Sequence, residues 1–311
     1  MEALRFCLAL LFVGCAVDCL YVAYDHVKQR RSNSRWFGTS ALVFFLNVVV
    51  VSLPGRMDSD PKNALSMPTL LAPAPWAFII WAVIYIGELM GLVRQACCTD
   101  SSNNKRFAAA ASAWNAANVA QILWCCTFRP WAQDMLWLSA MMLGTIAACL
   151  FPAQLKARSL TSATDYWTVV FPRSLHLGWA TAATLVNLNS YVGASFGPLT
   201  ALVVALLSVA VALDAGTFFV SCGLNSAAGA VAWALCACGT GRPSGPNVEA
   251  LGPAMIKSLQ WIELSAALWI CLAILKSVCA RSPSEASVIH AKQEKGEDEA
   301  LAHPLLGHVG A

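Results

Sequence analysis

Three side chains suited to ligand binding share one face of a single apolar segment. Trp81, Tyr85 and Glu88 are spaced i, i+4 and i+7, so in a helix they stack along one side. If that helix crosses a membrane, the carboxylate costs about 2.5–3.5 kcal/mol at bilayer depth and rarely faces lipid. The spacing therefore predicts that Glu88 faces protein or water inside a helix bundle.

A second stripe runs along a later segment, with Arg173 and His176 at its head and Ala183 and Asn187 further on. Small residues in such a stripe let another helix or a flat ligand approach closely. Because an isolated polar group in a membrane is costly, we expect Glu88 to meet Arg173 or His176 across the bundle. The alternative is that Arg173 extends to the membrane interface and His176 is a hydrogen-bonded core residue.

The composition identifies the setting of both stripes as a membrane. Hydrophobic residues make up 58% of the 311-residue chain and charged residues 12%, with a mean hydropathy of +0.61, whereas soluble domains carry about 25% charged residues. About 20 apolar residues cross a bilayer as one helix. The sequence predicts an all-α integral membrane protein, a multi-pass helical bundle with about nine spans, at residues 3–24, 38–54, 75–94, 107–128, 132–151, 167–189, 198–214, 216–239 and 258–279.

Charge distribution gives the expected organisation. We expect an N-terminal anchor and basic cytosolic loop at 1–37, the bundle at 38–280 and a disordered charged cytosolic tail at 281–311. With that loop in the cytosol, the cytosolic side collects 13 Lys and Arg against six on the other. The first span reads as a retained anchor, with a cleaved signal peptide as the alternative. Asp214 is expected in a turn between the seventh and eighth spans, and Glu263 near a span end.

Several functions are disfavoured by the residues themselves. A net charge of +3 without a basic patch argues against nucleic-acid binding. The 13 cysteines lie mostly in apolar runs, without the spacing of a zinc site or a disulfide framework. No hydrolase, metalloprotease, nucleotide-binding or dinucleotide-binding motif is present, so no catalytic or metal-binding residue is predicted. His176 alone is a weak candidate for an axial haem ligand.

Three segments carry a resemblance to a known family. APAPWAFIIWAVIYIGELMGL at 72–92 resembles the opening of a helix in the TspO/MBR family, which comprises tryptophan-rich sensory proteins and the translocator protein. FPRSLHLGWATAATLVNLNSYVG at 171–193 is similar to that family's Trp- and Asn-bearing helix, and WNAANVAQILW at 114–124 to its middle helix. The match is to the longer, divergent branch of the family, which has extra helices after a five-helix core. It departs at His176, where the family carries Tyr, and at Arg173, which replaces an apolar residue.

The resemblance implies a membrane receptor or binding protein for a flat apolar ligand of tetrapyrrole or sterol type, with a sensory or transport-associated role. No cofactor is required, and a tetrapyrrole would be a ligand. Membrane lipid and a second copy of the chain are the other expected partners. The alternatives are a secondary transporter that uses its intramembrane charges and a membrane enzyme acting on a bound porphyrin or lipid. The ligand contacts carried over by motif are Trp81, Tyr85, Asn118, Trp124, His176, Trp179 and Asn187.

Overall fold

The computed structural model describes residues 33–57, 67–97, 101–157, 160 and 162–280. The predicted first span at 3–24 and the charged tail at 281–311 lie outside these residues. Within them the chain is helical, and its only bridge between extended backbones joins Thr69 to Ser244. The prediction of an all-helical membrane bundle is therefore confirmed.

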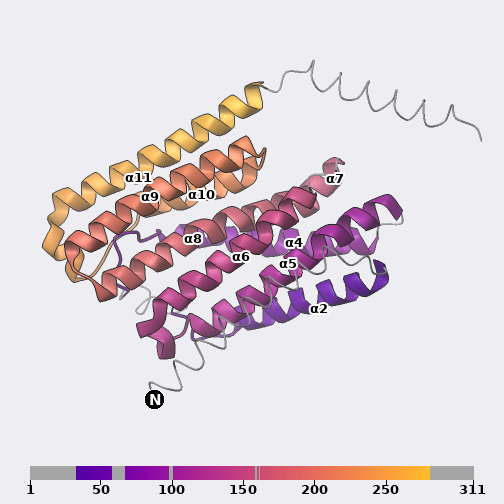
Figure 1. Cartoon of the computed structure of the whole chain (residues 1–311), viewed down its shortest axis with the longest axis horizontal. Coiled ribbons are helices and arrows are strands. Elements are labelled where there is room, and N and C mark those ends of the chain that lie inside the picture. The colour runs from indigo at the N-terminus through magenta and orange to yellow at the C-terminus, as the bar shows by residue number, and fades with distance from the viewer. Residues whose placement is uncertain (1–32, 58–66, 98–100, 158–159, 161, 281–311) are drawn as a thin grey trace, which may run out of the picture.

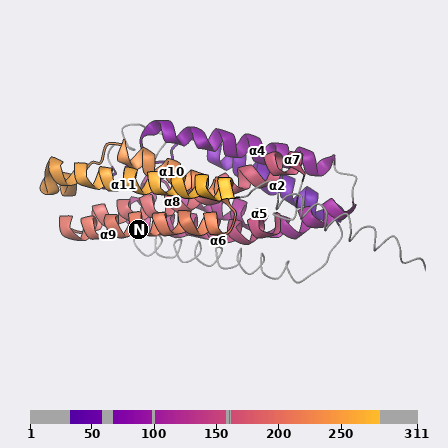
Figure 2. The ribbon, with the colours of Figure 1, turned by 90° about the horizontal axis from the view of Figure 1, so that it is seen from above.

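Eight long helices match eight of the nine predicted spans. They are α2 (Asn33–Ser52), α4 (Ile80–Ala96), α5 (Ser101–Thr127), α6 (Leu136–Ala157), α8 (Phe171–Ser195), α9 (Pro198–Ser221), α10 (Asn225–Gly239) and α11 (Pro246–Ala280). Short turns precede three of them: η1 (Pro75–Ile79) before α4, η2 (Pro130–Met135) before α6, and α7 (Ala163–Asp165) with the π-helical turn η3 (Tyr166–Val170) before α8. The helices run roughly along one axis, with α2 at one edge and α11 at the other (Figure 1). A view from above shows the same elongated bundle (Figure 2).

The helices differ in apolar character. Among the described residues, the stretches long and apolar enough to span a membrane on their own are Pro75–Ala96, Pro130–Ala157, Pro198–Ser221 and Pro246–Ala280, with Trp36–Ser52 a shorter apolar helix. α5 and α8 are more polar, since they carry Asn, Gln, Arg and His side chains. These side chains are buried against neighbouring helices. A helix that faces protein on most sides can carry such groups, whereas a lipid-facing helix cannot.

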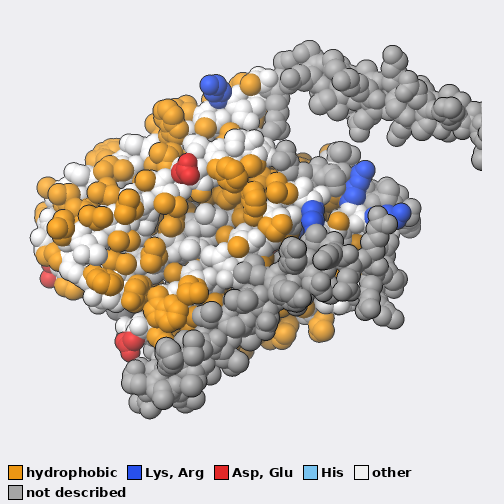
Figure 3. All heavy atoms as spheres, viewed as in Figure 1, with side chains coloured by type: hydrophobic (Ala, Val, Ile, Leu, Met, Phe, Trp, Pro, Cys, Tyr) orange, Lys and Arg blue, Asp and Glu red, His pale blue; other side chains and the backbone are white. Residues whose placement is uncertain are grey.

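The surface agrees with a membrane setting. Hydrophobic side chains cover most of the described face in Figure 3, and Lys and Arg gather toward the end of the bundle where α5 begins. Lys105 and Arg106 are exposed at that end. Positively charged residues of this kind are typical of the cytosolic side of a membrane helix.

Two sequence expectations at the C-terminal half are wrong. Asp214 lies within α9, which continues to Ser221, and the turn is formed at Gly223, whose φ is +70°. There the Leu224 amide donates to Phe219 O at 2.8 Å, which closes the end of the helix. Neither Asp214 nor Gly216 ends the helix, and Gly216 allows a close approach of Ile270, whose side chain a Cβ there would meet at 2.5 Å. Glu263 is buried between helices rather than near a span end, well inside α11.

Glycines set the closest helix contacts around α8. A Cβ on Gly178 would lie 2.0 Å from the carbonyl oxygen of Ala227 on α10. On α4, a Cβ on Gly87 would lie 2.5 Å from Pro172 Cβ, and one on Gly91 would lie 2.6 Å from Thr168 O. These glycines therefore let α4 and α10 pack directly against the backbone of η3 and α8.

We expect Gly178→Ala to destabilise the bundle by about 1–3 kcal/mol, since the new methyl overlaps the backbone of α10. The measurement is thermal unfolding in detergent. Gly229→Ala is the matched control because a Cβ there has nothing within 4 Å. Equal unfolding midpoints for the two variants would contradict the close packing of α8 on α10.

Glu263 gives a second stability prediction. Both of its carboxylate oxygens are buried without a hydrogen-bond partner among the described residues. Because an unsatisfied buried polar group costs about 1–3 kcal/mol, Glu263→Met should raise the unfolding midpoint in detergent, whereas Glu263→Gln should raise it less. A lower midpoint for the Met variant would show that the carboxyl has a stabilising partner.

Candidate ligand-binding site

A cavity of about 850 Å³ lies inside the bundle among α4, α5, α6, α8 and α10. It extends to the end of the bundle where α2, α5 and α10 end, opposite the end at which Lys105 and Arg106 lie. Its volume is within the range of small-molecule and cofactor sites, about 300–1,000 Å³. Its aromatic and polar lining residues are Arg56, Thr69, Phe78, Trp81, Tyr85, Gln121, Trp124, Phe128, Trp179, Asn187, Ser190, Thr240, Arg242 and Ser244.

Four aromatic rings from two helices form a nearly parallel stack along one wall of the cavity. Trp81 stacks on Tyr85 at 5.6 Å with an interplanar angle of 21°, and on Trp124 at 6.4 Å and 23°. Trp124 in turn stacks on Phe128 at 5.3 Å and 18°. The i, i+4 spacing places Trp81 and Tyr85 on one face of α4, and Phe128, directly after the end of α5, lies beside Trp124 of that helix. A flat ligand can extend such a stack with favourable ring contacts.

Trp179 on α8 is perpendicular to that stack. Its ring meets Trp81 at 6.3 Å and 84°, and Phe78 at 5.7 Å and 82°. Ala183 lies one turn further along α8 and also lines the cavity. The small side chain of Ala183 leaves space in the cavity between α8 and the aromatic rings of α4 and α5.

Hydrogen bonds hold the cavity rings in place. The Trp124 indole donates to Ser139 Oγ at 2.9 Å, and the Ser139 hydroxyl donates to Asn187 Oδ1 at 2.8 Å. On the other side, Gln121 Nε2 donates to the Tyr85 hydroxyl at 2.7 Å. Both networks link different helices within the membrane, and fixed rotamers of this kind preorganise a binding site.

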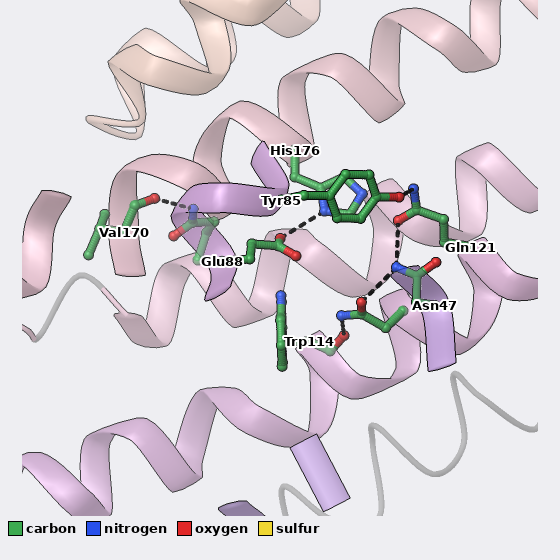
Figure 4. A network of polar contacts seen from close by, with 9 residues as sticks. Asn47, Tyr85, Glu88, Trp114, Gln121, Val170 and His176 are labelled. Carbon is green, nitrogen blue, oxygen red and sulfur yellow. Dashed lines mark hydrogen bonds and ion pairs between the residues drawn. The ribbon is translucent and has the colours of Figure 1, made fainter. Parts of the chain in front are cut away.

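The network around Tyr85 continues away from the cavity (Figure 4). Asn47 Nδ2 donates to Asn118 Oδ1 at 2.8 Å and to Gln121 Oε1 at 3.4 Å. Asn118 Nδ2 donates to the carbonyl oxygen of Trp114 at 3.0 Å. Asn118 is therefore a structural member of the network that orients Gln121 and Tyr85.

The open end of the cavity carries two arginines. Arg56 donates through Nη1 to Val51 O at 2.8 Å, and its guanidinium lies 5.8 Å from the Trp124 ring. Arg242 comes from the connection between α10 and α11. Positive charge at the rim of an otherwise apolar cavity favours a ligand that has an acidic group at one edge.

An extended segment, residues 67–74, forms part of this rim. Its backbone pairs with the α10–α11 connection, since Thr69 N donates to Ser244 O at 3.0 Å and Ser244 N to Thr69 O at 3.2 Å. A Cβ on Gly241 would lie 1.7 Å from Ala72 O, so only glycine permits this approach. The segment and the connection therefore hold Arg242 at the open end.

The intramembrane charges lie beside the cavity rather than in its lining. His176 Nδ1 and Glu88 Oε1 are 2.9 Å apart across the α4–α8 interface, and both side chains are fully buried. Arg173 is 3% exposed, and its guanidinium lies 4.5 Å from the Trp114 ring. The expected meeting of Glu88 with His176 is observed. The alternative in which Arg173 extends to the membrane interface is wrong, because α5 covers it with Trp114.

The residues carried over from the family resemblance divide into two groups. Trp81, Tyr85, Trp124, Trp179 and Asn187 line the cavity, whereas Asn118 and His176 do not. Sequence reasoning missed Arg56, Arg242 and Gln121. Gln121 could have been found from its spacing of three residues from both Asn118 and Trp124, but nothing local in the sequence indicates that the two arginines meet. Within the described residues, no three His, Cys, Asp or Glu side chains lie close enough to hold a metal ion.

The helix architecture, the aromatic cavity and the buried polar networks fit a membrane protein that binds a ligand. Comparison with known families agrees, since the TSPO-like protein family matches residues 35–276. The chain therefore belongs to the TSPO-like family, whose members are in general membrane proteins with ligand-binding or sensory roles. No curated protein and no solved structure matches the chain.

Proposed function

We propose that this protein binds a flat, largely apolar ligand with an acidic edge, of the tetrapyrrole type, and that binding serves a sensory or transport-associated role. The observation that carries the proposal is the parallel stack of Tyr85, Trp81, Trp124 and Phe128 in a cavity of about 850 Å³. The rings provide a surface for a planar macrocycle, and Arg56 and Arg242 provide partners for its carboxylates.

The arginines distinguish the two ligand classes that the family resemblance implies. A sterol presents a single neutral hydroxyl, which forms a weaker hydrogen bond with a guanidinium than a carboxylate does. A dicarboxylic tetrapyrrole offers one carboxylate for each arginine. We therefore favour the tetrapyrrole. From the distribution of Lys and Arg, we further propose that the cavity opens on the non-cytosolic side.

The test is equilibrium binding of protoporphyrin IX to the protein in lipid nanodiscs, with cholesterol as competitor and empty nanodiscs as background. We expect saturable porphyrin binding that cholesterol competes for weakly. Binding no stronger than to empty nanodiscs would overturn the tetrapyrrole proposal, and saturable binding of cholesterol alone would support the sterol instead.

A transporter is the second candidate, and the buried Glu88–His176 pair favours it. Porphyrin uptake into proteoliposomes separates the two functions. Saturable uptake that requires Glu88 would support transport, whereas binding without uptake would support a receptor.

A further inference from the structure

The Glu88–His176 pair lies next to the aromatic wall of the cavity, where His176 contacts Trp81. His176 Nδ1 and Glu88 Oε1 are 2.9 Å apart, and the exposed fraction is 0% for His176 and 1% for Glu88. Because the acid and the imidazole share one hydrogen bond in an apolar interior, a proton added there is shared by the pair. The pair is thus a candidate proton-binding site in its own right.

The second carboxylate oxygen of Glu88 and the second ring nitrogen of His176 can each form another hydrogen bond. Glu88 Oε2 and His176 Nε2 are buried without a hydrogen-bond partner among the described residues, as are Trp114 Nε1 and Arg173 Nη1. Figure 4 shows the indole nitrogen of Trp114 directed toward the Glu88 carboxylate. Arg173 covers the Trp114 ring and interacts electrostatically with Glu88. Donor groups therefore surround the acid on the side away from His176.

The charges of Glu88, Arg173 and His176 determine whether a proton at the pair strengthens or weakens the binding of an anionic ligand. An ionised Glu88 and a charged Arg173 cancel while His176 is neutral. One added proton leaves a net charge of +1, which is costly at this depth. An anion bound in the neighbouring cavity offsets that cost, so proton and anion should bind together.

Trp81 connects the pair to the cavity. Its ring lines the cavity and meets the His176 ring edge-on at 5.6 Å and 74°. Glu88 is seven residues beyond Trp81 on α4, a rise of about 10 Å. A charged ligand that stacks on Trp81 therefore lies close enough to the pair to interact with it electrostatically across the low-dielectric interior.

Few other ionisable groups face the pair. α4 contributes Tyr85, α5 contributes Cys125, which interacts electrostatically with Tyr85, and α8 contributes Arg173. A further ion pair, between Arg94 and Asp165 at 2.8 Å, lies toward the end of α4. The other polar neighbours are the amides and carbonyl of Asn47, Asn118, Gln121, Gln154 and Val170, which do not titrate.

We propose that Glu88 and His176 form a proton-binding site and that an anionic ligand in the cavity is bound together with a proton at this site. The second half of the proposal rests on the proposed function. It predicts proton uptake of up to one per ligand bound. It also predicts that ligand affinity is higher when the pair carries the added proton, on the order of threefold to tenfold.

The first test needs no ligand. Infrared difference spectra between about pH 5 and pH 8 are recorded for the parent, Glu88→Gln and His176→Gln in nanodiscs. We expect carboxyl and imidazole bands in the parent that change together, so that either single substitution removes both. Bands in the parent that persist in both variants would overturn the proton site.

The second test measures coupling in the parent alone. Protoporphyrin IX and its uncharged dimethyl ester are added to weakly buffered nanodiscs containing a pH-indicating dye. We expect proton uptake with the acid, after subtraction of empty nanodiscs, and none with the ester. Saturable binding of the acid without proton uptake would overturn the coupling while the proposed function stands. Absence of any saturable binding would instead overturn the proposed function, and the infrared result would still decide the proton site.

Discussion

Ala183→Phe is expected to weaken protoporphyrin IX binding by a factor of about 10 to 100. Ala183 lines the cavity on α8, one turn from Trp179, and a benzyl group there would occupy the space that the ligand needs. Overpacking of this kind costs about 1–3 kcal/mol, and each 1.4 kcal/mol corresponds to a tenfold change in affinity. The measurement is the equilibrium dissociation constant in lipid nanodiscs.

The matched control is the same substitution on the same helix outside the cavity. Ala194 is exposed near the end of α8, so Ala194→Phe should leave the dissociation constant within about threefold of the parent. Thermal unfolding of both variants shows whether either is misfolded. If Ala183→Phe is well folded and binds as tightly as the parent, the ligand does not occupy this cavity.

Arg56→Gln combined with Arg242→Gln should remove the preference for an acidic ligand. Hydrogen bonds to charged groups contribute about 1.5–3 kcal/mol each, but the rim is partly open to solvent, which weakens them. We therefore expect the double variant to bind protoporphyrin IX about 10 to 100 times more weakly than the parent does. Its affinity for the dimethyl ester should change by less than about threefold.

Lys257→Gln serves as a charge control, because Lys257 lies on α11 beside Trp261 and outside the cavity lining. It should alter neither dissociation constant. Parallel losses of affinity for the acid and the ester in the arginine double variant would mean that the arginines support the shape of the rim rather than recognise an anion.

Local patterns predicted the elements of this fold well. The i, i+4, i+7 spacing of Trp81, Tyr85 and Glu88 correctly placed them on one helix face, and the cost of a buried carboxylate correctly predicted an interior partner for Glu88. Eight apolar segments coincide with helices for the same reason, since apolar length is a local property. The end of α9 was misplaced because a single Asp or Gly does not end a helix whose other residues pack well.

Long-range contacts were beyond local patterns. Arg56 and Arg242 are 186 positions apart in the sequence and line one cavity in the folded chain, where residues 67–74 pair with the connection that carries Arg242. The different positions of Asn118 and Asn187 relative to the cavity also depend on long-range contacts. Both are helix asparagines with family counterparts, but Asn118 bonds to Asn47 of α2, whereas Asn187 faces the cavity. Only the packing of neighbouring helices decides such a difference.

Intrinsic tryptophan quenching by protoporphyrin IX most directly tests whether the ligand binds in the aromatic cavity. It is recorded for the parent, Trp179→Phe and Trp261→Phe, since Trp179 lines the cavity and Trp261 is 60% exposed on α11. We expect saturable quenching in the parent, a marked loss of quenching amplitude and affinity in Trp179→Phe, and little change in affinity in Trp261→Phe. Saturable quenching with the same affinity and amplitude in the parent and Trp179→Phe would contradict binding in this cavity.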